Sequence, residues 1–76
     1  MKKAQHRAIG EYISKLEEIA AAIQEIVSSE EDTFSDKSER WQESEAGEAA
    51  QETIDTLNQI VEAIESAAGD LSGVCD

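Results

Sequence analysis

Two stretches of the chain repeat apolar residues at alternating steps of three and four positions. The first contains Ile9, Tyr12, Ile13, Leu16, Ile19, Ala20, Ile23, Ile26 and Val27. The second contains Ala50, Ile54, Leu57, Ile60, Val61, Ile64, Ala68 and Leu71. This spacing is the period of an amphipathic α-helix, and the chain has no proline to interrupt it. The sequence therefore predicts an all-α fold built from two helices.

Arranged in heptads, the first stretch has three apolar columns: Ile9, Leu16 and Ile23; Tyr12, Ile19 and Ile26; and Ile13, Ala20 and Val27. A two-column stripe suits a two-stranded coiled coil, whereas a three-column stripe suits a helix that contacts more than one neighbour. We expect the core and dimer contacts to come from both stretches. The residues are Ile9, Leu16, Ile19, Ile23, Ile26, Ile54, Leu57, Val61 and Ile64.

The residues that mark helix starts and ends predict a single domain, residues 1–76, made of two helices of similar length. We expect a helix over about 4–28, a connection over 29–43, a helix over about 44–68 and a short tail. Ser44 is a suitable N-cap for the second helix, and Gly69 is a typical residue after a helix end. Arms of about 22–26 residues each span roughly 33–39 Å, which matches an antiparallel hairpin.

The predicted connection is polar, yet it contains the only Phe and the only Trp of the chain. We expect an ordered segment with a short helical turn from Ser38, in which Phe34 and Trp41 close one end of the molecule. A recognition role for Trp41 is the alternative, since Trp is favoured at binding hot spots. Gly47 costs a helix about 1 kcal/mol relative to Ala. It therefore indicates that a bulky side chain, Trp41 being nearest, packs against the backbone there.

The small size of the chain favours self-association. A chain of 76 residues buries only about 60% of its unfolded surface and is marginally stable alone. One Cys and one His cannot form an internal disulfide or a structural zinc site. Pairing two hairpins into a four-helix bundle would bury the wide stripes, so a homodimer is the expected state, with higher oligomers open.

Charge divides the chain unevenly. Eighteen acids and six bases give a net charge of −12, yet residues 1–15 hold four bases and one acid. From Trp41 onward there are nine acids and no Lys or Arg. Such a surface repels nucleic acid and attracts basic proteins. The acids form files on the outer sides of the predicted helices: Glu11, Glu18 and Glu25 on the first, and Glu45, Glu48, Glu52, Asp55 and Glu62 on the second.

Catalysis and metal binding are not expected. His6 lies among basic residues near the chain start, and Cys75 follows two glycines, so neither suggests a tuned reactive group. The run Glu30–Asp32 lacks the alternation and glycine of a calcium loop. We therefore predict no enzyme activity and no cofactor. No secretory signal or membrane span is apparent, which favours the cytoplasm.

One segment resembles a known group of proteins. Ser38–Glu48 reads SERWQESEAGE, and the pattern S-E-(K/R)-W-Q-x-S-E-x-G-E is found in small acidic helical proteins of bacteriophages and prophages. The upstream Glu31–Phe34 also fits, and the resemblance covers roughly residues 30–68. It implies a phage setting, in which small acidic proteins often block host nucleases, restriction enzymes or CRISPR effectors.

Two functional hypotheses follow, with a third behind them. The first is a phage-type inhibitor, a DNA mimic whose acidic surface occupies a basic, nucleic-acid-binding site on a host defence protein. The second is a helical assembly module whose acids serve solubility. The third, direct nucleic-acid binding through basic residues, is opposed by the net charge. Those residues are Lys2, Lys3, Arg7 and Lys15.

Overall fold

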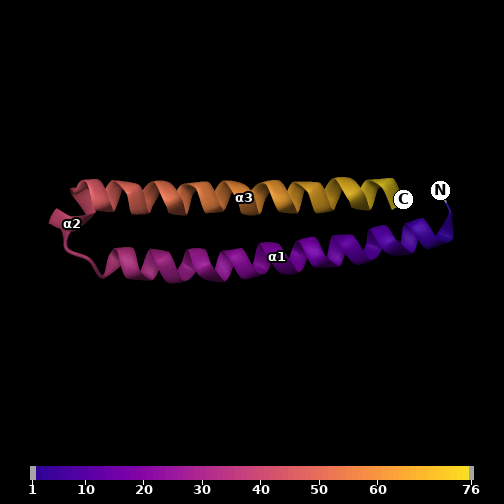
Figure 1. The fold of residues 1–76 in the computed structure, drawn as a ribbon, viewed down its shortest axis with the longest axis horizontal. Coiled ribbons are helices and arrows are strands. Elements are labelled where there is room, and N and C mark those ends of the chain that lie inside the picture. Colours follow the sequence, from indigo (N-terminus) through magenta and orange to yellow (C-terminus); the bar gives the residue numbers. More distant parts are fainter. Residues whose placement is uncertain (1, 76) are drawn as a thin grey trace.

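The computed structural model describes residues 2–75, with the side chain of Cys75 excepted, and that part of the chain is helical without a strand. Helix α1 spans Lys3–Ser35, α2 spans Glu39–Glu43 and α3 spans Glu45–Cys75. Figure 1 shows α1 and α3 lying side by side and antiparallel, with α2 at the corner that joins them. The predicted all-α fold is confirmed.

The molecule is a thin rod, because nothing in the described chain forms a second layer. Its principal extents are 58 × 15 × 13 Å, and its radius of gyration is 17.2 Å. A compact domain of this length would have a radius of gyration of about 11 Å. Each long helix therefore has one long neighbour, and both broad sides of the hairpin face solvent. The N-terminal end of α1 extends beyond the end of α3 (Figure 1).

A narrow seam between α1 and α3 forms the core. The buried apolar residues are Ala20, Val27, Ile54, Val61 and Ala68, at steps of seven within each helix. Ile9, Leu16, Ile23, Leu57 and Ile64 flank this seam and are half-buried. Ile19 and Ile26, predicted as core or dimer residues, lie outside the seam of the single hairpin, where they are 49% and 55% exposed. A helix with one neighbour buries one narrow strip, and here the strip centres on the column that includes Ala20.

Both long helices continue past their predicted ends. Phe34 lies seven residues after Val27, and Leu71 lies seven residues after Ile64, so the half-buried line continues in each helix. The predicted end at Gly69 is wrong because no glycine in the described residues has a positive φ, which a glycine after a helix end normally adopts. The predicted connection over 29–43 therefore shrinks to a few residues around α2.

Two serines begin the helices at the corner. The backbone N–H of Trp41 donates to Ser38 Oγ over 3.2 Å, which caps the start of α2. The N–H of Gly47 donates to Ser44 Oγ over 3.3 Å, and the Ser44 hydroxyl also donates to the carbonyl of Trp41. Both serines thus satisfy amide groups that a helix start leaves unpaired. The predicted turn from Ser38 and the predicted cap at Ser44 are confirmed.

Aromatic and amide side chains hold α2 against the end of α1. The rings of Phe34 and Trp41 meet edge to face with centroids 5.9 Å apart, and Lys37 Nζ lies 5.3 Å from the Trp41 ring. Gln42 Nε2 donates to the carbonyl of Phe34 over 3.0 Å and to that of Lys37 over 3.1 Å. Gln42 therefore adds a second donor to the Phe34 carbonyl, which also accepts from the backbone N–H of Lys37, and it binds the Lys37 carbonyl just after α1 ends.

Gly47 is required by the main chain. A Cβ built on Gly47 would lie closer than 3.0 Å to the carbonyl oxygens of Trp41 and Gln42, a separation that real Cβ atoms essentially never show. The nearest atoms belong to the backbone of α2 and not to a side chain, so the close approach at Gly47 is made by main chain, whereas a bulky side chain such as Trp41 was expected there. The close approach lets α3 begin at Glu45, with one residue between it and the end of α2, and with its first turn packed against the α2 backbone.

The motif Ser38–Glu48 is therefore the corner of the fold. Its serines cap two helices, its Trp and Gln fasten α2 to α1, and its Gly allows the close approach. The motif accordingly specifies how the chain turns, while its remaining residues, such as Arg40 and Glu48, are exposed.

Gln42→Ala should lower the melting temperature by about 5–10 °C. The variant removes two side-chain hydrogen bonds that tie α2 to the end of α1, which costs about 1–2 kcal/mol, and 1 kcal/mol moves the melting temperature of a small domain by roughly 4–8 °C. Circular dichroism at 222 nm checks this, with the exposed Gln59→Ala as the matched control. Equal melting temperatures for the two variants would show that Gln42 does not fasten the corner.

Candidate protein-binding surface

The two broad sides of the rod differ in chemistry. On one side, Glu17 and Gln24 of α1 line an open depression together with Glu65 and Ser72 of α3. A neighbouring depression on α1 is lined by Gln24, Glu25 and Glu31, and Asn58 of α3 completes it. These flanks of the two helices therefore face the same way. We call this side the acidic face and define it by Glu17, Glu25, Glu31 and Glu65.

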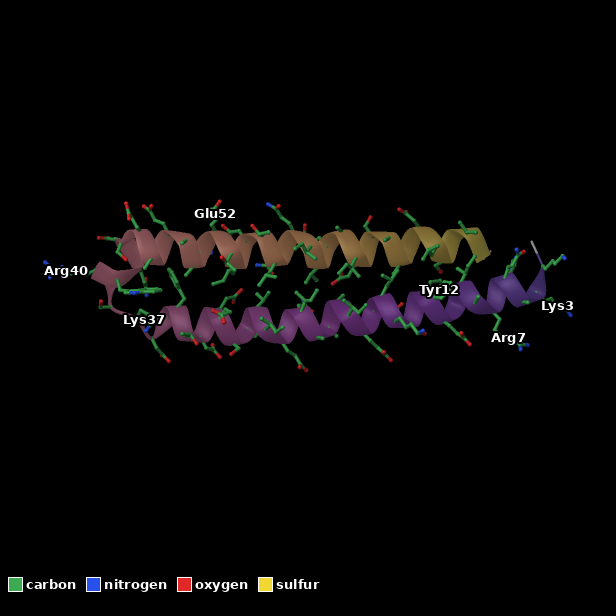
Figure 2. All side chains as sticks on the ribbon, in the orientation of Figure 1. Lys3, Arg7, Tyr12, Lys37, Arg40 and Glu52 are labelled. Atoms are coloured by element: carbon green, nitrogen blue, oxygen red, sulfur yellow. The ribbon has the colours of Figure 1, made fainter. Side chains whose placement is uncertain are left out.

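Further acids border the acidic face. Glu62 precedes Glu65 by three residues and Asp55 precedes Asn58 by three, so each pair is adjacent on the surface of α3. Glu52 points away from α1 on the outer side of α3 (Figure 2). All eight predicted partner-binding acids are exposed: Glu11, Glu18, Glu25, Glu45, Glu48, Glu52, Asp55 and Glu62.

Sequence reasoning missed three members of this face, Glu17, Glu31 and Glu65. Each lies next to the buried seam, where the sequence alone does not say which flank of a helix meets which. The signal was present, because residues 17, 24 and 31 form a polar column beside the one that contains Ala20 and Val27. The predicted core included the column of Ile19 and Ile26 and left out that of Ala20 and Val27, so the neighbouring polar column was not recognised as the edge of a face. The structure brings these acids from both helices to a single side.

Basic residues gather toward the ends of the rod. Lys3 and Arg7 lie near the free end of α1, and Lys37 and Arg40 lie at the corner (Figure 2). The sequence has no Lys or Arg between Lys15 and Lys37, and none after Arg40. The middle of the rod therefore presents carboxylates from both helices without an interspersed base, so its potential is negative.

The opposite side is apolar. On α1, Ile19 and Ile26 lie on the other side of the seam from Glu17 and Gln24, and on α3 Ile60 lies on the other side from Glu65. We define the apolar face by its exposed large residues and their fractional exposures. They are Tyr12 (54%), Ile19 (49%), Ile26 (55%), Ile60 (42%) and Val74 (52%).

Open depressions also occur on the apolar side of each helix. One on α1 is lined by Gln5, Ala8, Ile9 and Tyr12. Another, on α3, is lined by Ala49, Thr53, Thr56 and Leu57, with Glu52 at its outer edge. Each belongs to one helix, so no described element covers them. The predicted anchors Phe34, Trp41 and Gly47 lie together at the corner, apart from both faces.

Among the described residues, no group of three or more His, Cys, Asp or Glu side chains is placed to hold a metal ion. None of the helices within residues 2–75 is long and apolar enough to cross a membrane. The expectation about the thiol of Cys75 falls outside the described side chains.

Comparison of the chain with protein-family models, with curated proteins and with solved structures found no match.

Proposed function

We propose that this protein acts by binding, as a phage-type inhibitor whose acidic face occupies a basic, nucleic-acid-binding site on a host defence protein. One observation supports the proposal above the others: the middle of the rod displays acids from both helices with no base among them. Surfaces kept acidic for solubility alone usually mix both signs. Like charges along a helix also repel one another, so this arrangement costs stability that a binding role would explain.

The spacing of the acids suits imitation of a nucleic-acid strand. Glu48, Asp55 and Glu62 recur every seven residues on α3, which corresponds to about 10.5 Å along a helix. Three nucleotides of a DNA strand rise about 10.2 Å. A basic groove that contacts every third phosphate would thus find a carboxylate at a similar interval. The helix holds that interval because its backbone is rigid.

The setting comes from the resemblance of Ser38–Glu48 to small acidic phage proteins. That support is an association, since the motif residues build the corner and not the acidic face. A protein that blocks a host nuclease, restriction enzyme or CRISPR effector would act in the host cytoplasm. The geometry favours a protein partner over nucleic acid, because the acidic face repels phosphates.

An affinity capture tests the proposal. The tagged protein is incubated with host-cell lysate in 50 mM and 500 mM salt, and bound proteins are then challenged with duplex DNA. We expect capture of a basic protein at low salt, a large loss at high salt because screening weakens exposed charge pairs, and displacement by DNA. A captured protein that resists both salt and DNA would contradict the proposal. Direct retention of DNA by the chain would favour its basic N-terminal segment instead.

A second candidate function is a helical assembly module. It is favoured by the exposure of Ile19, Ile26 and Ile60, since a monomeric protein seldom exposes contiguous large apolar residues without a partner. In this proposal two hairpins pair into a four-helix bundle, the interface is the function, and the acids keep the bundle soluble. Binding would then be insensitive to surface charge and sensitive to changes at the apolar face.

A further inference from the structure

The apolar face is continuous across both helices. Exposed Ile19 and Ile26 adjoin half-buried Leu16 and Ile23 on α1, and exposed Ile60 adjoins half-buried Leu57 and Ile64 on α3. Between Ile9 and Ile26, this flank of α1 is apolar except for Lys15 at its outer margin. Alanines follow at its outer margin on α3, including Ala63 and Ala67, with Asp70 beyond them. The small alanine side chains allow another helical layer to approach closely.

The size of the face matches that of a specific interface. From Ile9 to Ile26, α1 rises about 26 Å, and two adjacent helices are about 20 Å wide, so the face covers about 500 Å². Two such faces in contact bury about 1,000 Å², the lower bound for a specific protein–protein interface. The seam alone buries five apolar residues, of which Ala20 and Ala68 contribute little area. The hairpin therefore gains a substantial share of its core from whatever covers this face.

Charge selects the occupant. Each copy carries a net charge of −12, and the acidic face would repel another copy. The apolar face, with exposed Ile19, Ile26 and Ile60, has acids only at its margins, such as Glu52 and Asp70, so two copies repel each other less there than at the acidic face. A basic partner would instead be drawn to the acidic face. Two copies that meet through their apolar faces leave both acidic faces on the outside of the assembly.

We propose that a second copy of this chain covers the apolar face, so that two hairpins form a four-helix bundle with an acidic face on each side. The inference names the surface for the self-association proposed above and rests on that proposal. It stands apart from inhibition: the bundle can form whether or not the acidic faces bind a host protein. Self-association through this face also makes thermal stability depend on protein concentration.

Photo-crosslinking locates the interface without removing any apolar contact. Tyr12→p-benzoylphenylalanine keeps an aromatic ring on the apolar face, and Glu25→p-benzoylphenylalanine places the same group on the acidic face. Light-scattering of the unmodified chain should give twice the 8.3 kDa of one chain. Irradiation should then yield covalent dimer from the Tyr12 position and about tenfold less from the Glu25 position. A monomeric mass at 100 µM, or equal crosslinking from both positions, would overturn the proposal.

A matched pair of substitutions gives an independent test. Ile19→Gln combined with Ile26→Gln should shift the protein to monomer, or raise its dimer dissociation constant at least about 100-fold. Ala21→Gln, on the acidic side of the same helix, should leave the mass unchanged. If the double variant unfolds, its concentration dependence is lost, and crosslinking from Tyr12 remains decisive. A double variant that stays dimeric would show that another surface joins the copies.

Discussion

Gly47→Ala should be the most damaging single substitution in the chain, lowering the free energy of unfolding by about 3 kcal/mol or more. A methyl group at this position would overlap the carbonyl oxygens of Trp41 and Gln42. Backbone atoms cannot move aside as the end of a flexible side chain can. Relief would require α2 to shift from the start of α3, which would weaken the ring contact between Trp41 and Phe34.

The other helical glycines provide matched controls of opposite sign. A Cβ at Gly69 or Gly73 would meet nothing within 4 Å, and neither residue has a positive φ. Alanine at each should therefore stabilise the helix by about 0.5–1 kcal/mol. Thermal melts at one protein concentration should show a fall of about 12 °C or more for Gly47→Ala and a rise of a few degrees for each control. An unchanged melting temperature for Gly47→Ala would show that the close approach of the α2 backbone does not require glycine at this position.

Much of the fold could be predicted because local signals agreed. The three-and-four spacing predicted two helices, and Ser38 and Ser44 marked the starts of α2 and α3. The glycine at position 47 predicted a close approach in the right place. The nearest atoms there are the backbone carbonyls of Trp41 and Gln42, which proximity in the sequence cannot distinguish from the Trp41 ring.

The rest could not be predicted because it depends on which flank of each helix meets the other. The sequence shows three adjacent apolar columns on α1, and only the packing of α3 selects the column that contains Ala20 and Val27. That choice exposes Ile19 and Ile26 and turns Glu17 toward the same side as Glu65. The second helix was predicted to end at residue 68 because glycine commonly follows a helix end. The apolar step of seven residues from Ile64 to Leu71 is the signal that the helix continues past Gly69.

Reversing three charges on α3 should abolish binding to the captured host protein. In the combined variant Glu48→Lys, Asp55→Lys and Glu62→Lys, each substitution replaces an attraction to a basic site with a repulsion. Opposed like charges cost several kcal/mol in an interface, so affinity should fall about 100-fold or more. All three side chains are exposed, and none lies in the seam, so the helical fold should be retained.

A second triple variant separates the position of the charges from their sum. Asp36→Lys, Glu39→Lys and Glu43→Lys change the net charge by the same amount but lie at the corner, where they are exposed. If the acidic face is the binding surface, this corner variant should keep most of its affinity. Equal losses from both triple variants would mean that the partner senses overall charge alone.

Titration calorimetry at 150 mM salt, which gives the affinity of these three proteins for the captured partner, tests whether the acidic face is the binding surface. Circular dichroism of each protein at the same concentration checks that it remains helical. We expect tight binding by the unaltered chain and the corner variant, and at least about 100-fold weaker binding by the α3 variant. Undiminished binding by a folded α3 variant would contradict this expectation and leave the assembly module as the function.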